Sequence, residues 1–228
     1  AEHRTRPRFS LSGLNLFRKE IDGFKVESGR LTVASGRAFS EEPVKMIRLF
    51  HAAQAHDLDI HPNALRLITR NLRLVDTLRD DAEANRLFLE MLTSAKGPEI
   101  TLRRMNEAGV FGRFIPDFGR VVAQMQHDMY HVFTVDEHTI FALGILHQIE
   151  QGEYADTMPA SSAAVHKVGS RNALYLAVLL HDIAKGRGGN HSELGADIAL
   201  RLGPRLGLSD EETETTAWLV RHHLLLSA

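Results

Sequence analysis

The feature that most constrains this chain is the helical spacing of its apolar residues, which begins near Ser40 and continues almost to the last residue. In the first half, Pro, Asp or Gly separates one such segment from the next, so short connections are expected. Helices are predicted over residues 43–58, 61–75, 82–92 and 98–109. Because helices joined by short connections pack as a compact bundle, we expect a mainly α fold.

One segment departs from this spacing. Residues 24–34 alternate apolar and polar side chains on either side of Ser28 and Gly29, which predicts a short β-hairpin. A two-stranded hairpin is marginal on its own. The sequence leaves open whether this hairpin folds alone or pairs with strands outside the chain.

Composition excludes several classes of protein. Of 228 residues, 43% are hydrophobic, which is enough for one large domain or two small ones and argues against disorder. The 27 Lys and Arg residues nearly balance the 29 Asp and Glu residues, and no basic stripe recurs along the helices, so neither a nucleic-acid nor an anionic-membrane partner is expected.

The expected location is the cytoplasm. The chain has no cysteine, so it can form neither a disulfide framework nor a thiolate metal site. Its longest apolar run, near residues 173–180, is too short to span a bilayer, and its first residues lack the apolar core of a signal peptide.

The second half of the chain, from about Pro116, is rich in histidine, a bias that points to metal chemistry. Its histidines are His127, His131, His138, His147, His166, His181, His191, His222 and His223.

Capping patterns locate the helices of this half. Thr134 to Glu137 and Ser209 to Glu212 each match the S/T-x-x-E pattern that opens a helix, the first carrying His138 in its first turn and the second running to Leu226. A further helix is predicted over residues 171–185, ended by Gly186, and a loop over residues 152–170.

Two adjacent residues at the end of that apolar helix carry the chemical signal. His181 continues the apolar stripe of the helix, so its imidazole is expected to point inward, and Asp182 follows it directly. An ionised carboxylate beside buried surface is costly unless it is paired or bound to a metal. For an isolated pair, a core histidine beside a helix-end aspartate would be the favoured interpretation. His138 upstream and the histidines downstream instead favour several helices converging on one divalent ion.

The residues around these positions resemble a known superfamily. LLHDIAKGRGGNHSELG, preceded by YHVFTVDEHT and followed by WLVRHHLLLS, resembles the HD phosphohydrolases, whose metal ligands are a first His, a His-Asp pair and a later Asp. RLFHAAQAHDLDIHPNALRLI and LRRMNEAGVFGRFIPDFGRVVAQMQHDMYH extend the resemblance to the bacterial bifunctional uridylyltransferase/uridylyl-removing enzymes, over nearly the whole chain.

This resemblance implies two domains. Residues 1–115 would be a helical connecting region, containing the hairpin, that follows a nucleotidyltransferase domain absent from this chain. Residues 116–228 would be an HD-domain helical bundle truncated at its C-terminus, because no aspartate after Asp210 is available as the later ligand. Neither the Gly-Ser and paired aspartates of the transferase nor a glutamine-sensing domain is present in the sequence.

The resemblance also implies the site residues. His138, His181 and Asp182 would be metal ligands, and His191 and His223 could hold a second ion; the expected cofactor is a divalent metal, Mg²⁺ or Mn²⁺. His181 and Asp182 would be catalytic. Lys185 would contact a substrate phosphate, although a solvated lysine at a helix end explains it equally well. We interpret His127 and His131 as loop histidines, or as histidines that contact a metal ligand without binding the metal. His222 either packs beside Trp218 or lies near the site.

The implied reaction is metal-dependent hydrolysis of the phosphodiester that joins UMP to the P-II nitrogen signal protein, with glutamine sensed by domains outside this chain. The residues alone reach only metal-assisted phosphoester hydrolysis. Two alternatives stay open: an HD hydrolase of small nucleotides, and a helical interaction or nucleic-acid-binding module without catalysis.

Overall fold

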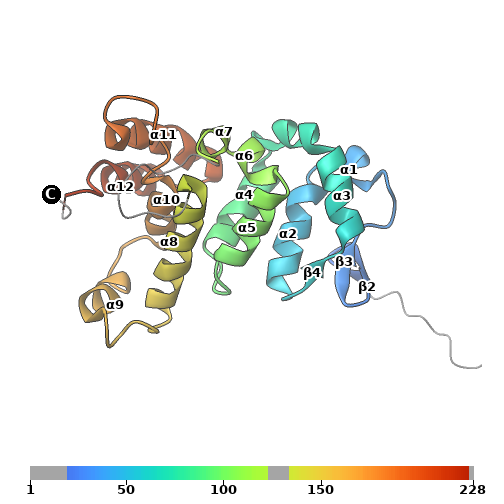
Figure 1. Ribbon diagram of the computed structural model, residues 1–228, viewed down its shortest axis with the longest axis horizontal. Coiled ribbons are helices and arrows are strands. Elements are labelled where there is room, and N and C mark those ends of the chain that lie inside the picture. The colour runs from blue at the N-terminus through green and yellow to red at the C-terminus, as the bar shows by residue number, and fades with distance from the viewer. Residues whose placement is uncertain (1–19, 123–133, 226–228) are drawn as a thin grey trace, which may run out of the picture.

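The computed structural model describes residues 20–122 and 134–225. It is an elongated array of helices with a small sheet at one end (Figure 1). The first half contains α1 (Ala38–Glu41), α2 (Lys45–Ala55), α3 (Pro62–Arg70), the 3₁₀ helix η1 (Leu72–Leu78), α4 (Ala82–Leu92), α5 (Glu99–Glu107), α6 (Val110–Phe114) and α7 (Pro116–Gly119). The second half contains α8 (Val135–Glu150), α9 (Pro159–Val165), α10 (Arg171–Leu180), α11 (His191–Leu206) and α12 (Asp210–Arg221). The mainly α prediction is confirmed.

The predicted hairpin is present and forms part of a four-stranded sheet. Its strands are β2 (Phe24–Glu27) and β3 (Arg30–Thr32), and both turn residues, Ser28 and Gly29, have the positive φ that a tight hairpin turn requires. β1 (Glu20–Ile21) pairs antiparallel with β2, and β4 (Asp59–Ile60) pairs parallel with β3. The sequence did not predict β1 and β4, because two residues are too few to display alternation.

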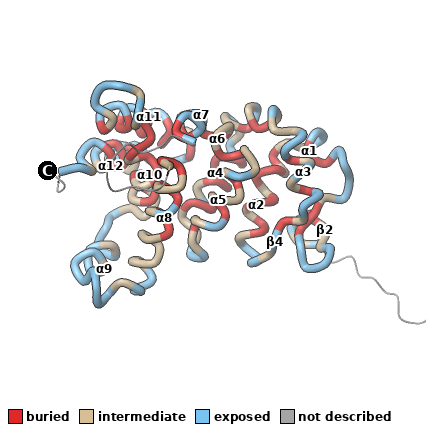
Figure 2. The backbone as a smooth tube through the Cα atoms, viewed as in Figure 1, coloured by how far each residue is buried: buried red, intermediate tan, exposed pale blue. Residues whose placement is uncertain are grey.

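Several predicted helix boundaries need correction. The helix predicted over 61–75 ends at Arg70 and continues as η1, and the helix predicted over 171–185 ends at Leu180. The predicted loop over 152–170 contains α9, which has no buried residue and lies pale blue at the edge of the molecule in Figure 2. The long helix α11 was not predicted.

Arg205 of α11 joins the second half to a cluster of buried aromatic rings in the first half. Phe111 and Phe118 stack with ring centroids 3.9 Å apart, and Phe88 packs 5.4 Å from Phe114. From α11, Arg205 donates a hydrogen bond to the carbonyl of Phe114 at 3.1 Å and places its guanidinium over that ring. The predicted domain boundary between residues 115 and 116 stays a prediction, and packing is continuous across it.

A partly buried ionic network makes a second connection between the halves. Arg171 of α10 donates to both carboxylate oxygens of Glu150 at 2.5 and 2.7 Å, and also to the carbonyl of Thr93 at the end of α4. The hydroxyl of Tyr175 donates to Glu150 at 2.8 Å. The network therefore ties α8 and α10 to the first half. Along the described parts of the chain, none of the helices combines the length and the apolar character that crossing a bilayer requires.

Candidate metal centre

Four histidines and one aspartate meet where the ends of four helices converge. His138 lies in the first turn of α8, His181 and Asp182 directly follow α10, His191 is the first residue of α11, and His223 lies just after α12. These are the five metal ligands that the sequence and its resemblance predicted. Because α10 ends at Leu180, His181 and Asp182 lie in the turn after the helix and not within the helix as predicted.

Local hydrogen bonds explain why the chain turns there. Lys185 N–H donates to the carbonyl of Asp182 at 3.0 Å, and Gly186, Gly188 and Gly189 all have positive φ. The side chain of Asn190 then accepts hydrogen bonds from the first backbone N–H groups of α11 and so starts that helix at His191.

Arg187 anchors this glycine-rich turn to the first half of the chain. Its guanidinium donates to the side chain of Asp117 at 2.8 Å and to the backbone carbonyl of the same residue at 3.0 Å. The sequence did not predict this role of Arg187, because its partner Asp117 lies 70 residues earlier in the chain.

The two predicted capping boxes have different outcomes. Ser209 and Glu212 form the reciprocal bonds of a capping box at the start of α12. Thr134 precedes α8 as predicted, but its side chain makes no capping bond. Glu137 instead accepts hydrogen bonds from Arg103 of α5 at 3.2 and 3.3 Å. The start of the helix was right and the capping box was wrong.

The five side chains form two groups that share Asp182. In the first, Nε2 of His138 lies 3.3 Å from Nε2 of His181, and Asp182 Oδ2 lies 3.5 and 3.9 Å from Nε2 of His181 and His138. In the second, Asp182 Oδ1 lies 3.7 and 3.8 Å from Nε2 of His191 and His223. Within each group the candidate ligand atoms all lie within 4.8 Å of one another. One carboxylate thus faces both groups, each through a different oxygen.

Backbone contacts fix the orientation of two imidazoles. Nδ1 of His181 lies 2.7 Å from the carbonyl of Val178, and Nδ1 of His223 lies 2.7 Å from the carbonyl of Val220. Since a carbonyl can only accept, each Nδ1 carries the proton and each Nε2 presents a lone pair to the cluster. Nε2 of His223 is buried and has no hydrogen-bond partner among the described residues. An unpartnered buried acceptor facing a carboxylate fits a metal ligand.

The pKa shifts of His181 and Asp182 also suit metal binding. Burial lowers the pKa of His181 below its ordinary value, which keeps the imidazole neutral and able to bind a cation. Burial alone would raise the pKa of Asp182, but its neighbours His181, Lys185 and His138 lower it on balance. The Lys185 ammonium lies 3.3 Å from Asp182 Oδ2. Asp182 therefore stays an anion although only 5% of its surface is exposed.

The donor set and its spacing suit a divalent cation. The Nε2 atoms of His138 and His181 are 3.3 Å apart, close enough for both to bind one divalent ion at about 2.0–2.1 Å. Imidazole and carboxylate ligands together accept first-row divalent metals as well as Mg²⁺ and do not select one of them.

Among the described residues, His222 was the other histidine considered for the site, and it lies outside both groups. His222 packs beside Trp218 with ring centroids 4.9 Å apart, as one of the two interpretations held, and belongs to neither group. His127 and His131 lie outside the described residues.

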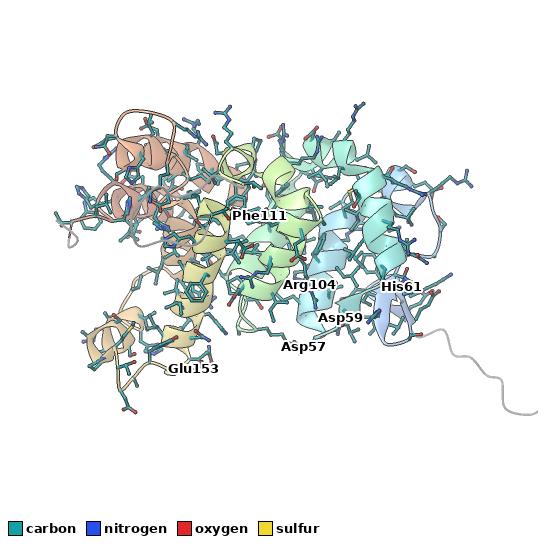
Figure 3. All side chains as sticks on the ribbon, viewed as in Figure 1. Asp57, Asp59, His61, Arg104, Phe111 and Glu153 are labelled. Atoms are coloured by element: carbon teal, nitrogen blue, oxygen red, sulfur yellow. The ribbon has the colours of Figure 1, made fainter. Side chains whose placement is uncertain are left out.

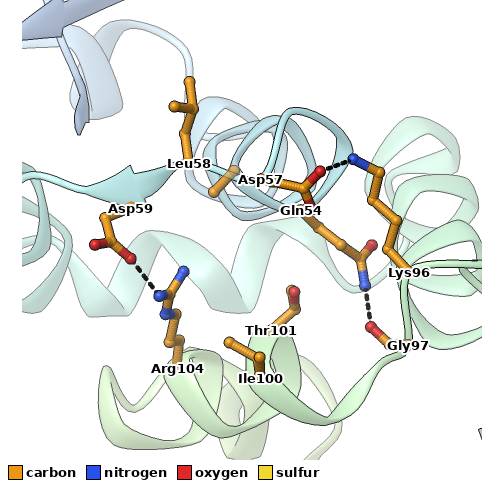
Figure 4. Close-up of a pocket in the computed structure, with 10 residues that line it drawn as sticks. Gln54, Asp57, Leu58, Asp59, Lys96, Gly97, Ile100, Thr101 and Arg104 are labelled. Carbon is orange, nitrogen blue, oxygen red and sulfur yellow. Dashed lines mark hydrogen bonds and ion pairs between the residues drawn. The ribbon is translucent and has the colours of Figure 1, made fainter. Parts of the chain in front are cut away.

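A polar pocket in the first half is separate from the histidine cluster. It lies between α2, β4 and α5, has a volume of about 190 Å³, and is drawn in Figure 4. Its charges are paired with one another, Asp57 with Lys96 and Asp59 with Arg104. Figure 3 places Asp57, Asp59 and Arg104 together at one edge of the first half. Paired charges leave this pocket with less to offer a ligand than the histidine cluster.

Two family models match separate parts of the chain. Residues 24–114 match the family described as the uridylyltransferase GlnD third domain, and residues 135–228 match the HD domain. Domains of the HD type bind divalent metals, which the His/Asp groups are suited to hold.

Curated relatives match the chain over almost its entire length. A bifunctional uridylyltransferase/uridylyl-removing enzyme of Azospirillum brasilense is 67% identical over 230 residues, covering 100% of this chain and 25% of that protein. An enzyme of the same name from Rhodospirillum rubrum is 60% identical over 226 residues, covering 99% of this chain and 24% of that protein. The chain thus spans about a quarter of the length of these relatives. With a GlnD third domain followed by an HD domain, the chain belongs to the family of bifunctional uridylyltransferase/uridylyl-removing enzymes.

Proposed function

We propose that this chain carries the uridylyl-removing activity of its family, the hydrolysis of the phosphodiester that joins UMP to a tyrosine of the P-II signal protein. The observation that carries the proposal is the pair of His/Asp groups sharing Asp182. The relatives' names, which include a uridylyl-removing activity, support the choice of bond. P-II as the partner, and glutamine sensing by other domains, follow from the family resemblance.

His138, His181 and Asp182 would hold one divalent ion, and Asp182, His191 and His223 a second. Mg²⁺ or Mn²⁺ is the expected cofactor. A divalent ion held there would supply two things: it would lower the pKa of a bound water molecule far below that of bulk water, toward about 7, and it would neutralise charge on the phosphoryl oxygens.

The side chains contribute position and charge. The carbonyls of Val178 and Val220 hold the imidazoles of His181 and His223 with Nε2 toward the cluster, so the ligands are oriented before substrate arrives. Lys185, beside Asp182, adds a positive charge near the phosphoryl group. His181 and Asp182 therefore act as ligands that touch the reacting centre, and Lys185 as an electrostatic partner of the phosphate.

The reaction balances without a covalent enzyme intermediate. The oxygen of water forms a bond to phosphorus while the bond between phosphorus and the tyrosine oxygen breaks. One proton from water ends on the tyrosine oxygen, and the products are unmodified tyrosine and UMP. Water is the only other reactant, and no oxidant is required.

The test is the double substitution His181→Ala with Asp182→Ala in the native polypeptide. It removes two ligands of the first group and the carboxylate that both groups share. UMP release from uridylylated P-II should disappear, while circular dichroism shows helix content unchanged. His222→Ala is the matched control, because His222 neighbours the cluster without belonging to either group. Full UMP release by the double variant would contradict the proposal, and a panel of free nucleotides tests the small-nucleotide alternative.

A further inference from the structure

An apolar groove opens beside the metal centre. It runs between α8, α10 and α12, has a volume of about 420 Å³, and has His181 and His223 in its wall. That volume lies within the range of roughly 300–1,000 Å³ that is usual for ligand sites. The cluster and the groove thus form one continuous site.

The helical repeat explains why the groove begins at the cluster. Each of three histidines has an apolar wall residue four positions away in the sequence: Ala142 for His138, Ala177 for His181, and Leu219 for His223. Further along α8, Ile145 and Leu146 continue the wall. Because His181 and His223 line the groove themselves, a group bound there lies beside the candidate ligands.

The lining is apolar apart from the two histidines. Among the described residues that form the wall, none carries a permanent charge or a side-chain hydroxyl or amide. The Nδ1 atoms of His181 and His223 already contact backbone carbonyls, and their Nε2 atoms face Asp182. An N–H, hydroxyl or carbonyl of a ligand would lose its hydrogen bonds to water in this groove without replacement.

We infer that this groove holds the aromatic ring of the leaving group, so that the site selects aryl esters of a nucleotide. The inference rests on the proposed function and concerns how that site recognises its substrate. An esterified tyrosine has no hydroxyl proton left to donate, so its ring is an uncharged apolar group that matches the groove. Uridine carries an N–H, two carbonyls and two ribose hydroxyls, which the groove cannot satisfy, so the nucleoside lies outside it. The phosphate stays at the cluster, near Lys185.

Blocking the groove separates the two parts of the substrate. Ala142→Leu fills the groove next to the cluster without adding a polar group, and Ala163→Leu makes the same change on exposed α9, outside the groove. The probes are the 4-nitrophenyl and methyl esters of UMP, incubated with the native polypeptide and Mn²⁺. Burying one aromatic side chain is worth roughly tenfold to hundredfold in binding. Ala142→Leu should therefore lower kcat/KM for the nitrophenyl ester by that factor. For the methyl ester, kcat/KM should change by less than about threefold.

Binding measured without turnover gives a second readout. Calorimetric titration with phenyl phosphate and with methyl phosphate should show a preference for phenyl phosphate in the wild type and in Ala163→Leu, but not in Ala142→Leu. Leu219→Ala removes a wall residue without filling the groove, and it should also weaken the binding of phenyl phosphate. It serves as the deciding variant if Ala142→Leu does not fold, as judged by thermal melting.

The outcomes distinguish the inference from the function on which it rests. Suppose that the wild type removes UMP from P-II. If Ala142→Leu then lowers kcat/KM for both esters by the same factor, or changes it for neither, the groove does not hold the leaving group and the inference is overturned. Equal loss on both esters would assign the groove to the nucleoside. If the wild type releases no UMP from P-II or from either ester, the proposed function itself fails, and the inference fails with it.

Discussion

Replacing Asp182 by asparagine should abolish the stabilisation of the chain by divalent metal. The carboxylate is 5% exposed and lies 3.5–3.9 Å from the Nε2 atoms of four histidines, so it is the one side chain common to both groups. Asparagine keeps the size and removes the charge. Each ion present at a hundredfold excess over its Kd stabilises the folded state by about 2.7 kcal/mol, so two ions contribute about 5 kcal/mol.

That free energy converts into a measurable melting shift. For a chain of this length, 1 kcal/mol raises Tm by about 2–4 °C, so each ion should add about 5–10 °C. Differential scanning fluorimetry of the 228-residue chain, with EDTA and then with excess Mn²⁺, measures this directly. His138→Ala and His223→Ala should each lose roughly half of the shift, because each removes a ligand from only one group.

The control is Asp197→Asn, an exposed carboxylate on α11 outside both groups. It should retain the full shift. If Asp182→Asn kept the wild-type response to Mn²⁺, the carboxylate would not be a metal ligand and the prediction would be refuted.

Three further substitutions test the supports of the site. Arg187→Ala removes the guanidinium that holds Asp117, so urea unfolding should show a loss of about 1–3 kcal/mol. The hydrogen bond from Arg171 lowers the pKa of Glu150 below 4.5, so the stability it contributes is present above that value and lost as pH falls through the lowered folded-state pKa. Glu150→Gln should therefore unfold in urea with a weaker dependence on pH below about 5 than the wild type. Gly203→Ala would place a Cβ 2.6 Å from a buried threonine hydroxyl of α12, and thermal unfolding should show a destabilisation of about 1–3 kcal/mol.

Helix boundaries were predicted best where the apolar residues keep a regular helical spacing and a clear capping or polar segment marks the end of the helix. Helix α4 begins at Ala82 and ends at Leu92 as predicted, because Asp81 caps its first turn and a polar segment follows its last. The end of α10 was misplaced since His181 keeps helical backbone angles at the C-cap, so the apolar pattern continues past the last helical hydrogen bond. Strands of two residues, such as β4, have no pattern to read.

The capping motifs show where local pattern stops being sufficient. Thr134 and Ser209 start the same motif, yet only Ser209 forms the capping box, because Arg103 of a distant helix takes the carboxylate of Glu137. Tertiary contacts of this kind are invisible in a local window. The site behaves likewise: the residue types and the resemblance identified five candidate ligands, but not that Asp182 faces both groups through separate oxygens.

Helix α11 has His191 at its first turn and, near its other end, Arg205 fastened to the carbonyl of Phe114. Sixteen residues at 1.5 Å each make a rod of about 24 Å. A tilt of one degree about the Arg205 end displaces the His191 end by about 0.4 Å, which exceeds the tolerance of roughly 0.2 Å that metal–ligand distances allow. Helix α11 thus amplifies small movements: a slight rotation at Arg205, where the helix is held to the connecting region, moves His191 far enough to place it within or beyond metal-binding distance.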